Sequence, residues 1–218
     1  LSQQDEDEAT YNMIQRAYTI GVFQIESRAQ MSMLPRLKPQ EFYDLVIEVA
    51  IIRPGPIQGD MVHPYLRRRN GEEPVSYPSR EVQGVLERTL GVPIFQEQVM
   101  QLAIVAAGFS PGEADQIRKA VGKKKEDEIA RHKTQFIDGA VANGYTRAEA
   151  EAVYADIEFF ANYGFNKAHA ADYAMITCQT AFLKAHYPVE YMTALLSVEK
   201  NDTAKVAIYC ADCRRMGF

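Results

Sequence analysis

The sequence predicts a mainly α-helical protein with a few short β-strands. Apolar residues recur along most of the chain at the three- and four-residue spacing that gathers them on one face of a helix. Residues 110–113 (Ser-Pro-Gly-Glu) and 146–149 (Thr-Arg-Ala-Glu) are capping boxes, in which a hydroxyl and a glutamate bond each other's backbone amides. Only residues 21–27 and 91–95 have the composition of short strands.

The expected helices are connected by short turns that carry start and stop signals. Ser27 can cap a helix, and Pro39 and Pro188 suit a first helical turn. Arg53-Pro54-Gly55-Pro56 ends a helix because two prolines fix the backbone and remove amide donors, and Gly122 is expected to break or bend another. In chain order, the helices are expected near residues 8–18, 27–34, 39–52, 80–90, 96–108, 110–122, 126–142, 146–162, 169–187, 188–198 and 201–216.

The length of 218 residues allows one large domain or two small ones. A loop with two prolines at residues 72–79 follows the turn residues Asn70-Gly71, so we expect one domain over residues 1–218 with subdomains over 1–78 and 79–218. No apolar run approaches the roughly 18 residues of a membrane span, and the acidic N-terminus lacks the features of a signal peptide. We therefore expect a cytoplasmic protein with no membrane partner and, because it lacks an initiator methionine, a piece of a longer polypeptide.

The three cysteines do not make a disulfide framework. Cys210-Ala-Asp-Cys213 has the spacing of a metal or redox motif, but no second pair of ligands accompanies it. On a helix the same spacing simply places two small apolar residues on one face, and this is the interpretation that we favour.

The densest positive charge lies at residues 117–125, in a chain whose net charge is −5. This stretch holds Arg118, Lys119 and Lys123–Lys125 without an acidic residue. Such a cluster suits a polyphosphate or a nucleic-acid backbone. The alternative is a solvated helix end, because cations near a C-terminus interact favourably with the helix dipole. Charge alone leaves both interpretations open.

A second unusual stretch reads Tyr163-Gly164-Phe165-Asn166-Lys167-Ala168-His169. Its aromatic rings could stack on a base, and its amide, ammonium and imidazole groups could bind phosphate or base edges. Alternatively, the rings anchor a helix corner while Asn166 or His169 caps a helix. No signature of bond-breaking chemistry accompanies these stretches, since Glu26, Glu97, Asp115 and Asp172 occur singly and no phosphate-binding glycine loop or nucleophilic triad is present.

Several motifs together resemble consecutive motifs of the α subunit of bacterial DNA polymerase III, a C-family DNA polymerase. In family order they are Gly21-Val22-Phe23-Gln24-Ile25-Glu26-Ser27, Arg53-Pro54-Gly55-Pro56, Phe95-Gln96-Glu97-Gln98-Val99-Met100, residues 117–125, residues 163–169, Leu183-Lys184-Ala185-His186-Tyr187-Pro188 and Arg214-Arg215-Met216-Gly217. They cover nearly the whole chain. The resemblance implies a mostly helical fingers domain, which closes over the nascent base pair and helps to hold the incoming dNTP.

The resemblance also implies which residues bind the nucleotide. Arg118 and Lys119 match paired basic residues that contact the triphosphate. Family members often have two arginines here, so Lys119 keeps the charge but loses the planar, bidentate geometry. The residues around 166–169 match a loop near the nascent base pair, and Arg53 lies in a motif that the family keeps. The candidate nucleotide-binding residues are therefore Arg118, Lys119, Lys123, Asn166, Lys167, His169 and Arg53.

In the family, three metal-binding aspartates belong to a palm domain that precedes this region. The resemblance therefore implies that Mg²⁺ binds to the palm of the intact polymerase. It also implies that this chain supplies no catalytic or metal-binding residue, binds no cofactor and is inactive alone. Expected partners are the incoming dNTP, primer–template DNA and the remaining domains of the subunit. The sliding clamp and other holoenzyme subunits would bind only through the thumb, phosphoesterase-like and C-terminal regions outside this chain.

The two halves resemble different branches of the family. Residues 21–115 are similar to the error-prone, translesion paralogue, and residues from Arg118 onward are similar to the replicative branch, so a chimera is one hypothesis. The alternative function is a non-catalytic helical module that binds nucleic acid through the same basic surface.

Overall fold

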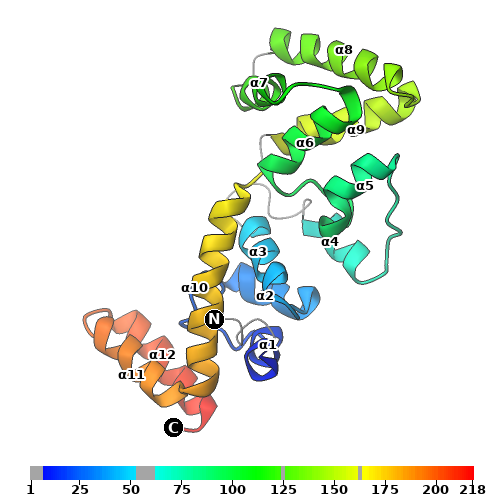
Figure 1. The fold of residues 1–218 in the computed structure, drawn as a ribbon. Helices are drawn as coiled ribbons and strands as arrows, with labels where there is room; N and C mark the ends of the chain where they lie inside the picture. The colour runs from blue at the N-terminus through cyan, green and yellow to red at the C-terminus, as the bar shows by residue number, and fades with distance from the viewer. Residues whose placement is uncertain (1–6, 53–61, 124–125, 162–163) are drawn as a thin grey trace. The chain divides into compact units, whose positions relative to one another are not determined.

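The computed structural model describes residues 7–52, 62–123, 126–161 and 164–218 (Figure 1). In these residues the regular structure is helical, which confirms the mainly α prediction. The helices are α1 (Glu8–Gln15), α2 (Arg28–Leu37), α3 (Phe42–Ile51), α4 (Val62–Arg69), α5 (Arg80–Leu86), the short 3₁₀ helix η1 (Glu87–Thr89), α6 (Gln96–Ala107), α7 (Pro111–Gly122), α8 (Glu126–Ala142), α9 (Arg147–Ala161), α10 (Lys167–His186), α11 (Pro188–Val198) and α12 (Thr203–Met216).

The chain divides into two compact units. Unit 1 combines both ends of the sequence, Leu1–Gly55 and Ala168–Phe218, and unit 2 is the continuous segment Pro56–Lys167. None of the described helices is long and apolar enough to cross a membrane.

Unit 2 is built around α6, which packs against α5, α7, α8 and α9 (Figure 1). Val99, Leu102, Ala103 and Ala106 are buried along this helix, as its apolar sequence predicts. Their removal from water is the main stabilising contribution of the helix, at roughly 25 cal/mol per Å² of apolar surface. The expected buried central helix is therefore confirmed.

The capping boxes that were predicted at the start of α7 and α9 are both present. The Glu113 carboxylate accepts a hydrogen bond from the Ser110 backbone at 2.8 Å, and the Glu113 amide donates to Ser110 Oγ at 3.3 Å. Thr146 and Glu149 repeat the pattern at 2.8 and 3.2 Å. Each box satisfies amides that have no partner within the helix, which explains why these helix starts were readable from sequence.

In unit 1, the expected strand at residues 21–27 is not formed. The Lys184 ammonium donates to the Ile20 carbonyl at 2.6 Å, the Tyr191 hydroxyl donates to the Gly21 carbonyl at 2.6 Å, and the Phe23 amide donates to Thr180 Oγ1 at 3.2 Å. These side chains of α10 and α11 take the place of a neighbouring strand. The segment is therefore a compact loop.

The second expected strand, residues 91–95, is reduced to a single parallel bridge between Phe95 and Phe165. The residues that follow the bridge enter α6 and α10, so the pairing does not continue in that direction. The helix expected from Pro39 begins at Phe42, because the Asp44 carboxylate accepts from the amides of Gln40 at 2.8 Å and Glu41 at 3.3 Å before the helix starts.

Helix α3 is buried almost all round, from Asp44 to Ala50, and not along one stripe. Glu48 lies within it and is fully buried. Helix α4 was not predicted, and the turn at residues 53–56 lies outside the described residues.

Candidate functional site

Helix α7 presents Arg118 and Lys119 beside a shared carboxylate, Asp115. Asp115 Oδ1 accepts hydrogen bonds from Arg118 Nε at 3.0 Å and Nη2 at 2.7 Å, and its Oδ2 lies 2.6 Å from Lys119 Nζ. Residues three and four positions apart share one helix face, so this arrangement follows from the sequence spacing. Hydrogen bonds from Lys119 and then Arg118 lower the pKa of Asp115 below its usual range. Two cations and one anion therefore leave this face positively charged.

The opposite face of α7 fixes the helix in unit 2. Ala114, Ile117, Ala120 and Val121 are buried there, so the basic face points away from the core. The Lys119 side chain is 59% exposed and that of Arg118 is 30% exposed. The Arg118 side chain is thus partly shielded from solvent, while more of the Lys119 side chain is exposed, although both are paired with Asp115.

Lys123 follows at the end of α7, which stops at Gly122 as predicted. Its side chain is exposed, and its backbone amide donates to the Lys119 carbonyl at 3.1 Å. A cation at this place also suits the negative end of the helix dipole, so both interpretations of the basic stretch fit Lys123. Lys124 and Lys125 lie outside the described residues, as does Arg53.

The second cluster joins two segments that lie about 70 residues apart in sequence. Glu97 Oε1 accepts from Asn166 Nδ2 at 3.1 Å, and both carboxylate oxygens lie 3.1 Å from the Lys167 amide. The Phe165 amide donates to the Ile94 carbonyl at 3.1 Å, and the Gln96 amide donates to the Phe165 carbonyl at 2.9 Å. The loop that carries Asn166 and Lys167 is thereby fixed on the start of α6.

Close packing explains the glycine in this loop. A Cβ atom at Gly164 would lie 2.9 Å from the Gln96 amide nitrogen, closer than real side chains approach. The Lys167 ammonium lies 5.7 Å from the centroid of the Phe95 ring, within cation–π range. Phe165 therefore holds the loop through its backbone, while Asn166 is exposed; Tyr163, the other ring of the expected aromatic pair, lies outside the described residues.

His169 belongs to unit 1, where it is exposed on the first turn of α10. Its ring centroid lies 4.1 Å from that of Tyr173, which in turn lies 5.3 Å from that of Phe23. Apart from Lys123, the candidate residues that the structure describes thus fall into three groups, centred on Asp115, on Glu97 and on Tyr173. Sequence reasoning treated Asp115 and Glu97 as isolated carboxylates. The spacing from Asp115 to the two cations was a usable signal, whereas nothing local connects Glu97 with Asn166.

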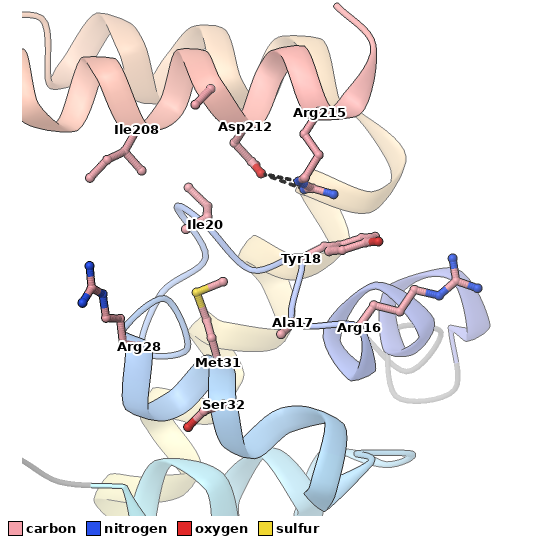
Figure 2. Close-up of a pocket in the computed structure, with 11 residues that line it drawn as sticks. Arg16, Ala17, Tyr18, Ile20, Arg28, Met31, Ser32, Ile208, Asp212 and Arg215 are labelled. Atoms are coloured by element: carbon pink, nitrogen blue, oxygen red, sulfur yellow. Dashed lines mark hydrogen bonds and ion pairs between the residues drawn. The ribbon is translucent and has the colours of Figure 1, made fainter.

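Unit 1 contains a hollow of about 690 Å³ between the loop at residues 16–20, α2 and α12 (Figure 2). Tyr18, Met31 and Ile208 line it, with arginines at its edge, and Figure 2 shows Arg215 reaching Asp212. Arg215 Nη2 lies 2.7 Å from Asp212 Oδ1, and its guanidinium lies 4.0 Å from the Tyr18 ring centroid. The hollow is therefore mainly apolar with cations at its edge.

The cysteine pair in α12 does not join a metal cluster with any other side chain that the structure describes. Across the described ranges, no group of three or more His, Cys, Asp or Glu side chains is arranged to hold a metal ion. Burial, followed by the nearby Cys210, raises the pKa of the Cys213 thiol. A raised thiol pKa disfavours the reactive thiolate, so the pair fits the interpretation as small apolar residues.

Comparison with known proteins gives a consistent result. Residues 2–144 match the family model described as the bacterial DNA polymerase III alpha subunit finger domain. The chain is 56% identical to a protein of Vibrio vulnificus (strain YJ016) named error-prone DNA polymerase, in an alignment of 219 positions that covers 100% of the chain and 21% of that protein. A protein of the same name from Pseudomonas paraeruginosa is 60% identical over 88% of the chain, which covers 19% of that protein. A third, from Alkalilimnicola ehrlichii, is 56% identical over 97% of the chain, which covers 21% of that protein.

The chain thus spans about a fifth of the length of the curated relatives that it matches. The similarity to proteins named error-prone also runs through both halves, including the stretch from Arg118 onward that resembled the replicative branch.

Proposed function

Because the chain belongs to the bacterial DNA polymerase III alpha subunit finger domain family, we propose that it forms the fingers of an error-prone DNA polymerase and binds the incoming dNTP. The observation that carries this proposal is that the half-buried Arg118 and the exposed Lys119 lie on one face of α7. In the proposed complex, these cations neutralise the triphosphate. Asn166, Lys167 and His169 face the nascent base pair, and Lys123 and Arg53 contribute to nucleotide binding.

The chemical contribution of this chain is positioning and electrostatic stabilisation. Phosphoryl transfer spreads negative charge over the phosphate oxygens, and fixed cations lower the energy of that charge without covalent chemistry. The described residues do not provide a cluster suited to a divalent cation, so no step is assigned to a metal held by this chain. In the complete enzyme, Mg²⁺ would be held by another domain, and the isolated chain would be inactive. Primer–template DNA and the other domains would be its partners.

The test is Arg118→Ala in the complete polymerase. Loss of a hydrogen bond to a charged group costs about 1.5–3 kcal/mol, so we expect kcat/KM for dNTP to fall by roughly tenfold to a hundredfold. Arg147→Ala is a matched control, because Arg147 is also an exposed helix residue that pairs with an acid within one turn, Glu151 at 3.2 Å. Unchanged kcat/KM in Arg118→Ala would contradict the proposed role.

The second candidate function is a self-contained nucleic-acid-binding module, which the net positive face of α7 also favours. Titration of the 218-residue chain with single-stranded DNA at several salt concentrations separates the two. A self-contained module should bind with a steep salt dependence, because each neutralised phosphate releases counterions. A fingers domain should bind weakly by itself, since other domains complete its site.

A further inference from the structure

We propose that Glu97 is a positioning residue that controls nucleotide use through Asn166, without itself touching the nucleotide. This inference rests on the proposed function, because it requires that Asn166 borders the nascent base pair. Glu97 has no assigned role, and it belongs to α6, whereas the residues that it holds lie at the start of α10.

The first step is the set of bonds that the Glu97 carboxylate accepts. One carboxylate oxygen accepts a hydrogen bond from the Asn166 side-chain amide at 3.1 Å. Both oxygens lie 3.1 Å from the Lys167 backbone nitrogen and accept from its N–H. Lys167 is the first residue of α10, where a backbone amide has no acceptor within the helix. A carboxylate is also favoured there by the positive end of the helix dipole. One side chain therefore fixes both the start of α10 and the amide before it.

The second step is that the backbone already holds Glu97 against this loop. The hydrogen bonds between Ile94, Gln96 and Phe165 set the register of the two segments, and Gly164 allows their close approach. Residues 165, 166 and 167 each bond to the segment 94–97. The Glu97 carboxylate needs little additional ordering to reach Asn166, so the contact is pre-organised.

The third step is the direction that this contact gives to Asn166. An ionised carboxylate only accepts hydrogen bonds, so Asn166 must turn its NH₂ group toward Glu97. The amide oxygen then lies on the opposite side of the side chain, as an acceptor. Removing Glu97 would remove this constraint on the orientation of the amide. Glu97 thereby selects which end of Asn166 a nucleotide meets.

The test uses the complete polymerase and measures kcat and KM for dNTP. We expect Glu97→Ala to raise KM roughly three- to tenfold, the effect of losing one typical intramolecular hydrogen bond. Glu97→Gln keeps an acceptor oxygen and should recover most of the loss. In an Asn166→Ala background, adding Glu97→Ala should change KM by less than about twofold, because the two residues act as one unit. Gln101→Ala is the control, since Gln101 is exposed on the same helix.

Hydrogen–deuterium exchange on the same variants tests the structural step separately from the proposed function. Exchange in a peptide covering residues 164–170 should accelerate in Glu97→Ala but not in Gln101→Ala, with the rest of the protein unchanged. Unchanged exchange would overturn the positioning role. If exchange is faster in Glu97→Ala but its KM is unchanged, the coupling to nucleotide use is overturned. The same holds if the KM effects of Glu97→Ala and Asn166→Ala simply add in the double variant. If Arg118→Ala and Asn166→Ala both leave KM unchanged, the proposed function itself fails, whatever the exchange result.

Discussion

Replacing Glu48 by leucine should stabilise the protein at neutral pH. Glu48 is fully buried in α3, and among the residues that the structure describes neither of its carboxylate oxygens has a hydrogen-bond partner. Burial raises the pKa of this carboxyl well above its usual range. An unpaired buried polar group costs about 1–3 kcal/mol, which an apolar side chain of similar size would avoid. For a chain of this length, that gain corresponds to a rise in Tm of about 2–12 °C.

The stability difference between Glu48→Leu and the unchanged protein should depend on pH. Below the ordinary glutamate pKa of about 4.5, the carboxyl is protonated in both the folded and unfolded states, so the ionisation cost is absent. As pH rises, the unfolded chain releases this proton while the folded chain retains it. The unchanged protein therefore loses stability until the raised pKa of folded Glu48 is passed, and the advantage of leucine grows over the same interval.

The assay is urea unfolding followed by far-UV circular dichroism at several pH values. Glu190→Leu serves as the matched control, because Glu190 is exposed on α11 and its replacement should change stability by no more than about 0.5 kcal/mol. A Glu48→Leu protein that is less stable than the unchanged protein at pH 8 would refute the reasoning. An advantage that is the same at pH 4 and pH 8 would refute the part of it that concerns ionisation.

Three further predictions concern single contacts. Lys184→Met should lower the free energy of unfolding in urea by about 3–5 kcal/mol, because the buried Lys184 ammonium lies 2.7 Å from Asp212 and the substitution removes that partner. Adding Asp212→Leu should recover part of the loss. Gly164→Ala should destabilise unit 2 by about 1–3 kcal/mol, because the new methyl group would meet the backbone of Gln96. Gly84→Ala should stabilise unit 2 by about 0.4–1 kcal/mol, because Gly84 lies in a helix with open space beside it. Equal effects of the two substitutions in chemical denaturation would contradict the close-approach argument. Ser110→Ala should cost about 0.5–2 kcal/mol through the lost cap, and rapid amide exchange at the start of α7 would report it.

Helix starts were predictable from the sequence where a cap is made by residues within one turn. Ser110 with Glu113 and Thr146 with Glu149 are such cases, and α11 was predictable from a different local signal, the proline at its first position. The shared face of Asp115 and its two cations was predictable in the same way. All of this information is local, so one sequence contains it.

The loop at residues 20–25 and the contact of Glu97 were not predictable, because their partners are distant in sequence. The loop has the apolar composition of a strand, but two of its carbonyl groups accept hydrogen bonds from Lys184 and Tyr191. These two residues lie more than 150 positions further along the sequence. A carboxylate such as Glu97 looks isolated until the fold brings Asn166 to it. Long-range contacts of this kind depend on helix packing, which periodicity alone does not specify.

The division of the chain has a consequence for the order of folding during synthesis. Unit 2 is continuous and can fold as soon as residue 167 has left the ribosome, whereas unit 1 waits for α10–α12. Until then, the loop at residues 20–25 lacks Thr180, Lys184 and Tyr191, which bond its backbone. Chain closure over such distances is slow compared with local helix formation. We therefore expect residues 56–167 to fold during synthesis while residues 1–55 still expose apolar surface, which a chaperone could bind in that interval.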